Sequence, residues 1–317
     1  MKFLIIFLCL ALGQFITINC SGLELVQPGQ SSVRSDPSKL RICNSDFAID
    51  LKRIYGGEDA KPMEFPYQAS LQVRYLNSHV CGATLITNRW ILCAAHCFSR
   101  NSYPYSWQIK LGEHDLRKKD STERLLKVDK IIIHKKYDRN NQLYDIALLR
   151  LEKPIDFSRE RHLKTICLAK ETDVAKNNYE CVATGWGRGN KGKNVHAFSW
   201  PLIFSFNSIT GRVVTDVLQK LPQPVHNSTT CQQIWKGVGW PITRNHICIG
   251  DLRGGKGVCN GDSGGPIQCR LKNGDWVQFG IASWTISDCV SRNFAAVFTS
   301  VSGYRNWIIE TIRKNSY

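Results

Sequence analysis

From residue 54 onward, short runs of β-branched, apolar and aromatic residues alternate with residues that favour turns. Examples are residues 68–73, 83–86 and 277–282. Runs of this length between turn residues predict strands. The end of the chain differs, because residues 304–312 space their apolar side chains at the helical period. The pattern therefore predicts an all-β fold with a C-terminal helix.

The first 53 residues lack this alternation. Lys2 is followed by an apolar run over residues 3–12, which predicts a cleaved signal peptide over residues 1–21. A membrane-spanning helix needs about 20 apolar residues, so we expect no membrane anchor. Residues 22–53 are polar and aperiodic, and they predict an extended propeptide. We therefore expect a secreted protein whose folded domain covers residues 54–317.

Composition sets limits on the class of protein. A chain of 317 residues allows one large or two small domains, and thirteen cysteines indicate an oxidising compartment. The net charge of +16 has two interpretations: a solvated basic surface, or a surface that attracts acidic partners. Because the basic residues are scattered and no nucleic-acid-binding motif is present, we expect no nucleic-acid partner.

Three segments carry residue types that suit nucleophilic catalysis. Residues 261–266, Gly-Asp-Ser-Gly-Gly-Pro, place a serine among glycines, which let a backbone approach a substrate carbonyl closely. His96 follows an apolar run, and Asp145 precedes another. Each segment alone is compatible with an ordinary turn or strand end. Histidine, aspartate and serine together are the parts of a nucleophilic triad.

With three further segments, these motifs resemble the trypsin/chymotrypsin family of serine endopeptidases. In chain order they are 54–57 (Ile-Tyr-Gly-Gly), 94–97 (Ala-Ala-His-Cys), 145–148 (Asp-Ile-Ala-Leu), 185–187 (Gly-Trp-Gly), the serine loop 261–266 and 283–284 (Ser-Trp). The resemblance covers residues 54–317. It implies two six-stranded antiparallel β-barrels, a C-terminal helix and an active site in the cleft between the barrels.

The resemblance also implies a role for each catalytic residue. Ser263 attacks the scissile carbonyl, His96 takes its proton, and Asp145 orients the imidazole. The backbone N–H groups of Gly261 and Ser263 form the oxyanion hole. The reaction is peptide-bond hydrolysis through an acyl-enzyme, and it requires no cofactor.

Activation by proteolysis is implied at one bond. Lys52 and Arg53 precede Ile54, so an upstream activating protease is expected to cleave after Arg53. In the family, the α-amino group freed by this cut pairs with the carboxylate just before the catalytic serine, which is Asp262 here. The buried charge pair then assembles the oxyanion loop, so the precursor is inactive.

Cysteine count alone does not give disulfide connectivity, but the resemblance implies five pairs. They are Cys81–Cys97, Cys181–Cys269, Cys231–Cys248, Cys259–Cys289 and Cys43–Cys167. The last pair would tether the propeptide after activation. Cys93 is left over and is expected to be a buried free thiol that packs as a small apolar group.

The family's pocket positions suggest an apolar specificity. The floor maps to Gly257 and lacks the aspartate of trypsin-like members, so cleavage after Arg or Lys is disfavoured. The walls map to Ser283, Trp284, Thr285 and Ala296, and the last two replace glycines of deep pockets. A narrow apolar slot resembles elastase-like members and suggests small or medium aliphatic residues at P1. A chymotrypsin-like preference for Leu or Phe is the alternative.

Two accessory sites are also expected. Glu113, Asp115, Asp120 and Glu123 lie in one loop that resembles the family's calcium loop; an exposed charged loop is the alternative. Asn227 begins an Asn-Ser-Thr sequon for N-glycosylation.

One segment departs from the family pattern. Residues 188–217 replace a short surface loop, and they contain an apolar run over 198–206 that is unusual on a surface. Three interpretations stay open: a partner-binding loop, a lid over the cleft, or translated non-coding sequence over about residues 194–211.

The leading hypothesis is a secreted, zymogen-activated serine endopeptidase, monomeric, acting in digestion or in a regulated cascade. Its expected partners are protein substrates, an activating protease and protein inhibitors. The alternative is a catalytically impaired protease scaffold that binds or regulates. The complete triad argues against this alternative.

Overall fold

The computed structural model describes residues 57–175, 179–188, 214–286 and 289–316. The expected signal peptide, the expected propeptide with Cys43, the expected activation bond Arg53–Ile54 and the apolar run of 198–206 lie outside these residues. Among the described residues, no helix has the length and apolar character needed to cross a membrane.

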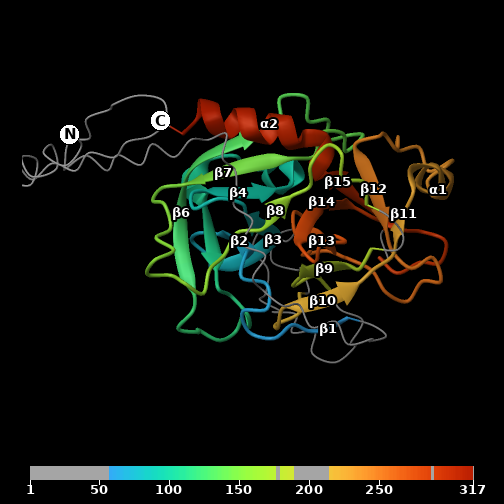
Figure 1. Cartoon of the computed structure of the whole chain (residues 1–317). Coiled ribbons are helices and arrows are strands. Elements are labelled where there is room, and N and C mark those ends of the chain that lie inside the picture. Colours follow the sequence, from blue (N-terminus) through green and yellow to red (C-terminus); the bar gives the residue numbers. More distant parts are fainter. Residues whose placement is uncertain (1–56, 176–178, 189–213, 287–288, 317) are drawn as a thin grey trace, which may run out of the picture. The chain divides into compact units, whose positions relative to one another are not determined.

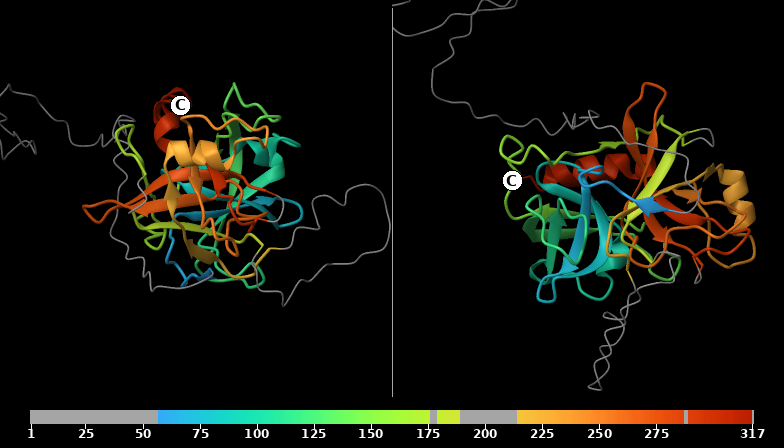
Figure 2. Two further views of the ribbon diagram at one scale, coloured as in Figure 1. Left: turned by 90° about the vertical axis from the view of Figure 1, so that its right-hand side faces the viewer. Right: turned by 90° about the horizontal axis from the view of Figure 1, so that it is seen from below.

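Two β-sheets lie side by side and form the body of the domain (Figures 1 and 2). The first is a closed six-stranded barrel in the order β2-β3-β4-β7-β6-β5. Its strands are β2 (Gln68–Val73), β3 (Ser78–Leu85), β4 (Trp90–Cys93), β5 (Trp107–Leu111), β6 (Arg124–Ile133) and β7 (Ala147–Leu151). All neighbouring strands pair antiparallel.

The second sheet has six main strands in the order β10-β9-β13-β14-β15-β12. They are β9 (Cys181–Gly185), β10 (Gln219–Pro222), β12 (His246–Ile249), β13 (Pro266–Arg270), β14 (Trp276–Trp284) and β15 (Ala296–Ser300). Three two-residue strands extend it to nine: β1 (Glu58–Asp59), β8 (Cys167–Leu168) and β11 (Val225–His226). This sheet curls but does not close. The expected second barrel is therefore a half-barrel with three additional two-residue strands.

Two 3₁₀ turns and two α-helices complete the described part of the fold. They are the 3₁₀ turns η1 (Ala95–Phe98) and η2 (Pro104–Ser106), the helix α1 (Ser228–Ile234) and the C-terminal helix α2 (Val301–Lys314). Helix α2 begins three residues before the expected 304–312 segment, because the Ser300 side chain caps it by accepting a hydrogen bond from the N–H of Gly303. Its buried residues Val301, Tyr304, Ile308 and Ile312 join the barrel core.

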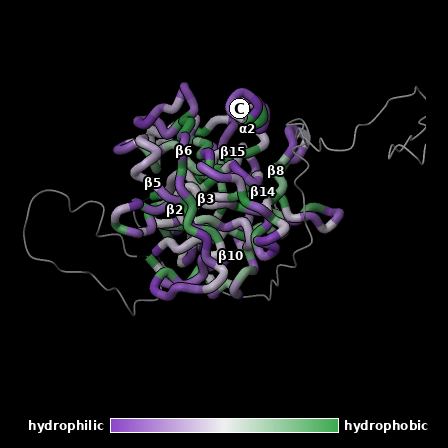
Figure 3. Tube along the Cα trace, turned by 90° about the vertical axis from the view of Figure 1, so that its left-hand side faces the viewer, coloured by the Kyte–Doolittle hydropathy of each residue, from purple (hydrophilic) through white to green (hydrophobic). Residues whose placement is uncertain are grey.

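The strand β2 explains how the two sheets are held together. Ala69, Leu71 and Val73 point into the barrel core, as the alternating pattern predicts. Gln68, on the opposite face, is also buried, and it accepts a hydrogen bond of 2.7 Å from Thr184 of β9. Gln68 of β2 therefore pairs with the second sheet, while hydrophilic residues elsewhere gather along the outer loops (Figure 3).

Candidate active site

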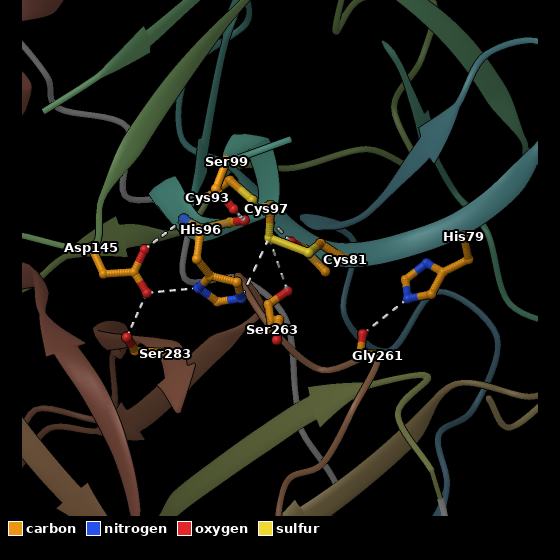
Figure 4. The surroundings of a disulfide bond; sticks show 11 residues. His79, Cys81, Cys93, His96, Cys97, Ser99, Asp145, Gly261, Ser263 and Ser283 are labelled. Carbon is orange, nitrogen blue, oxygen red and sulfur yellow. Dashed lines mark hydrogen bonds and ion pairs between the residues drawn. A yellow bond between two sulfur atoms is a disulfide. The ribbon is translucent and has the colours of Figure 1, made fainter. Parts of the chain in front are cut away.

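Strand pairing brings His96 and Asp145 together. His96 lies on η1, three residues after Cys93, and Asp145 precedes β7; the pairing of Cys93 with Ala147 places these two strand ends side by side. His96 Nδ1 lies 2.7 Å from Asp145 Oδ2, and the backbone N–H of His96 donates to Oδ1 at 2.8 Å. Because a carboxylate only accepts, Nδ1 carries a proton and Nε2 is left facing the cleft (Figure 4).

The carboxylate of Asp145 is fully buried and is held from the second sheet. Ser283 Oγ of β14 donates to Oδ2, and Thr299 Oγ1 of β15 donates to the Asp145 carbonyl oxygen at 2.9 Å. Burial acts to raise the pKa of Asp145, but the charge of His96 and hydrogen bonds from His96 and Ser283 outweigh it, so the pKa is lowered. Asp145 is therefore ionised and able to stabilise an imidazolium.

Ser263 lies beside the imidazole of His96 (Figure 4), and both residues line one cleft. The structure records no hydrogen bond between Ser263 Oγ and His96 Nε2. The Sγ of Cys97 lies 3.9 Å from this nitrogen, but it is part of a disulfide and has no proton to donate. Catalytic hydrogen bonds are often loose before substrate binds and tighten in the complex, so the arrangement suits proton transfer from serine to histidine.

The loop around Ser263 needs its glycines. Gly261 has φ +103° and Gly264 has φ +78°, a region that residues with a Cβ rarely adopt. A Cβ on Gly264 would also lie 2.5 Å from the Gly82 carbonyl oxygen. This loop therefore presents Ser263 to the cleft, whereas Gly261, the other expected oxyanion donor, is not among the cleft-lining residues.

His79 supports the same loop and was not predicted from the sequence. Its Nε2 lies 2.9 Å from the Gly261 carbonyl oxygen, and its Nδ1 lies 2.8 Å from Ser70 Oγ. Because a carbonyl oxygen only accepts, Nε2 carries the proton and Nδ1 accepts from Ser70. No local sequence signal identifies His79, since its partner Gly261 is 182 residues away.

Asp262, next to Ser263, lines the cleft, but its carboxylate is held in hydrogen bonds to backbone N–H groups. Its carboxylate accepts from the N–H groups of Gly187 at 2.7 Å and Cys259 at 2.8 Å. Burial raises its pKa to about 6, although these two hydrogen bonds oppose the rise. No cationic partner of Asp262 lies among the described residues. Its proposed partner, Ile54, and the cleavage residue Arg53 lie outside them.

The cleft has a volume of ≈ 940 Å³ and is lined by both sheets. Ser283, Trp284 and Thr285 line it as expected. Gly257 and Ala296 do not. A Cβ on Gly257 would lie 2.3 Å from the Cys289 carbonyl oxygen, and Ala296 is buried within β15.

Trp240 also lines the cleft and was not predicted from the sequence. The ring of Trp240 packs edge-on against the ring of Trp284, with centroids 4.7 Å apart. The Trp240 residue is 38% exposed. It lies in the connection after α1, with Gly237 and Gly239 at positive φ nearby. The wall that begins at Ser283 is therefore more aromatic than the family motif indicates.

Four disulfides join the cysteines that the resemblance paired: Cys81–Cys97, Cys181–Cys269, Cys231–Cys248 and Cys259–Cys289. The first anchors the turn that carries His96, and the last ties the serine loop to the cleft wall. Cys167 is also disulfide-bonded, while Cys43 lies outside the described residues. Cys93 is a buried free thiol, as expected, and donates to the Gly82 carbonyl oxygen.

The expected calcium ligands do not converge on one site. The ammonium of Lys110 lies 2.9 Å from Glu113 Oε2 and 3.2 Å from Glu123 Oε2, so a lysine already neutralises both glutamates. Asp115 faces Lys118 at 3.1 Å. The backbone N–H of Asp120 donates to Glu123. These residues do not fit a calcium ion, because the position between the two glutamates holds a positive charge.

Asn227 is exposed at the start of α1. Its side-chain oxygen accepts from the N–H of Thr230 at 2.8 Å and caps the helix. The carboxamide nitrogen, to which an N-linked glycan attaches, is not used in this bond.

The ends of the segment 189–213 lie together beside the serine loop. Arg188 N–H donates to the Asn260 carbonyl oxygen, and Thr215 N–H donates to the Trp186 carbonyl oxygen, both at 2.9 Å. The described residues on the two sides of this segment are therefore anchored to neighbouring parts of the domain.

Comparison with known proteins agrees with this geometry. The family model described as Trypsin matches residues 54–308, a range that contains His96, Asp145 and Ser263. Chymotrypsin-C of Rattus norvegicus is 34% identical over 271 residues, which cover 82% of this chain and 89% of the relative.

Proposed function

The chain belongs to the trypsin family of serine proteases, and we propose that it is a secreted serine endopeptidase made as an inactive precursor. The observation that carries the proposal is the 2.7 Å contact between His96 Nδ1 and Asp145, beside Ser263 in one cleft. A protease scaffold that only binds has no need of a buried, ionised aspartate behind its histidine.

In the proposed mechanism, Ser263 Oγ attacks the carbonyl carbon of the scissile bond. His96 Nε2 takes the hydroxyl proton and later gives it to the departing amine. The N–H groups of Gly261 and Ser263 donate to the oxyanion, each typically stabilising the transition state by about 3 kcal/mol. Water then releases the acyl group by the same steps in reverse, with His96 again acting as the base.

Cleavage between Arg53 and Ile54 would switch the enzyme on. The new α-amino group of Ile54 would pair with Asp262, whose carboxylate is buried and has only N–H donors among the described residues. A buried carboxylate without a cation is costly, which favours this pairing. We also propose that Cys43 pairs with Cys167 to retain the propeptide.

For specificity, we propose cleavage after small or medium apolar residues. Trp284 and Thr285 line the cleft, and in the described part of its lining no free carboxylate is present for an Arg or Lys side chain. The similarity to a protein named Chymotrypsin-C keeps Leu or Phe at P1 as the alternative. Digestion and a regulated cascade are both compatible with this specificity.

The test begins with cleavage of the precursor at Arg53–Ile54, followed by a peptide panel varied at P1. Turnover of Ala, Val or Leu peptides but not Arg peptides supports the proposal. A covalent serine-directed probe should label Ser263 in the activated protein. Ser263→Ala should abolish both turnover and labelling; activity that persists in this variant contradicts the mechanism. An activated wild-type protein that neither labels nor hydrolyses any peptide favours the binding-scaffold alternative.

A further inference from the structure

Two arginines line the cleft, Arg100 and Arg139. Both side chains are exposed. Among the described residues, neither forms an ion pair, while most other cleft-lining residues are apolar or neutral. An exposed guanidinium without a partner is available to a ligand, and its planar fork matches a carboxylate.

Among the described residues, the cleft lining has no exposed carboxylate that would neutralise these arginines. Asp262 is the acidic residue among its described lining, and its buried oxygens accept from Gly187 and Cys259. Asp138, the sequence neighbour of Arg139, uses both of its oxygens to accept from Asn140 and Asn141. Among the described residues, Asp138 therefore forms no ion pair with Arg139.

The two arginines belong to different segments of the chain. Arg100 follows Cys97 by three residues, and Arg139 lies in the turn closed by Asp138 and Leu143, shortly before Asp145. The first segment is tied to Cys81 by the Cys81–Cys97 disulfide, and the second leads to the carboxylate that accepts from His96 Nδ1 (Figure 4). A peptide in the cleft therefore meets arginines from two separate segments.

We propose that Arg100 and Arg139 are specificity-determining residues that select peptides with Asp or Glu near the scissile bond. This inference rests on the proposed endopeptidase function and adds the class of substrate, an acidic peptide. The net charge of the chain, +16, acts in the same direction, because a positive field raises the encounter rate with an acidic substrate. Both effects weaken as salt screens the charges.

The test compares peptides that share one P1 residue and differ by Glu, Gln or Lys at each of three positions on either side of the cut. We expect a Glu peptide to exceed its Gln counterpart in kcat/KM by roughly threefold at the favoured positions at low ionic strength, and to lose this advantage in high salt. Arg139→Gln and Arg100→Gln should each remove part of this preference, at different positions of the peptide.

Arg313→Gln is the matched control, because it removes one exposed positive charge from α2, away from the cleft. This control should keep the wild-type ratio of Glu to Gln turnover. The inference is overturned if the double variant Arg100→Gln/Arg139→Gln keeps that ratio, or if Arg313→Gln lowers it equally. An enzyme that hydrolyses the Gln peptides without any Glu preference also overturns it, yet leaves the proposed function standing. Absence of turnover on every peptide contradicts the proposed function itself.

Discussion

The imidazole of His79 donates a hydrogen bond of 2.9 Å to the carbonyl oxygen of Gly261. This bond joins strand β3 of the barrel to the loop that carries Ser263. The ring also packs against Trp186, with centroids 5.3 Å apart. A buried side chain of the first sheet thus holds the backbone whose N–H groups are proposed to stabilise the oxyanion.

Replacing His79 with Phe should lower kcat by about tenfold and leave KM nearly unchanged. The reason is that direct loss of an oxyanion donor costs about a hundredfold or more, and His79 acts on the donor loop only through the Gly261 carbonyl. Steady-state kinetics on one peptide would measure this. His226→Phe is the matched control, because His226 makes the same kind of bond to the Gly250 carbonyl oxygen outside the cleft. Equal kcat in the two variants would contradict the role of His79.

Asp262 should make the stability of the uncleaved precursor depend on pH. Its pKa is raised from 3.8 to about 6 by burial, so the unfolded chain loses this proton at a lower pH than the folded precursor. Stability should therefore fall as pH rises from about 4 to about 6, by up to about 3 kcal/mol, and stay low above that.

Thermal unfolding of the precursor across this pH range tests the prediction. Asp262→Asn should remove this part of the slope and raise precursor stability at neutral pH. After cleavage the same variant should be inactive, because the α-amino group has no carboxylate to pair with. A precursor whose pH profile is identical in the wild type and Asp262→Asn would argue against the assignment.

The cation that bridges Glu113 and Glu123 should be Lys110 rather than calcium. The melting temperature of the wild-type protein should therefore not change with a chelator. Lys110→Ala should cost about 3 kcal/mol, because it leaves two carboxylates, that of Glu113 fully buried, without their cation. Millimolar calcium should restore part of the loss in this variant, since oxygen ligands then face an empty position.

Lys118→Ala provides the comparison for Lys110. Lys118 pairs with Asp115, but its side chain is 72% exposed, so its removal should cost less than about 1 kcal/mol and create no response to calcium. A wild-type protein that melts at lower temperature in chelator would refute the replacement of calcium by lysine.

Cys93 should not react with thiol reagents in the native protein. Burial raises the pKa of this thiol far above its ordinary value, and the nearby charge of Asp145 adds to the rise. The reactive thiolate is therefore scarce, and the sulfur is enclosed next to Gly82 and Gly264. Mass spectrometry after iodoacetamide treatment should find Cys93 labelled only in denaturant. Rapid labelling at native conditions would contradict its burial.

Thr285→Gly should widen the specificity of the cleft. Removing a side chain from the wall beside Trp284 makes room for larger P1 residues, and such steric differences are worth about tenfold in kcat/KM. The ratio of Phe to Ala turnover should rise by about that factor. Thr172→Gly, on an exposed turn, is expected to leave the ratio unchanged. If Thr285→Gly leaves the ratio unchanged too, Thr285 does not narrow the P1 site.

The strand and helix periods along the chain predicted the fold class, because local alternation decides which face of a segment is buried. Residues 68–73 correspond to β2, and the segment 304–312 lies within α2. The motifs around His96, Asp145 and Ser263 were recognisable for a related reason. Each of these residues lies in a short run of particular residue types, and such a run can be read directly from the sequence.

Contacts between distant segments were decided by the tertiary structure alone. The bond from His79 to Gly261 spans 182 residues, and Lys110 reaches Glu123 because β5 pairs with β6. Sequence reasoning left a calcium loop and an exposed charged loop open for Glu113 and Glu123, because ligand types and spacing do not tell which cation lies between two carboxylates. Periodicity and motifs are local properties of a chain, whereas the charge and geometry of a site depend on which side chains the packing brings together.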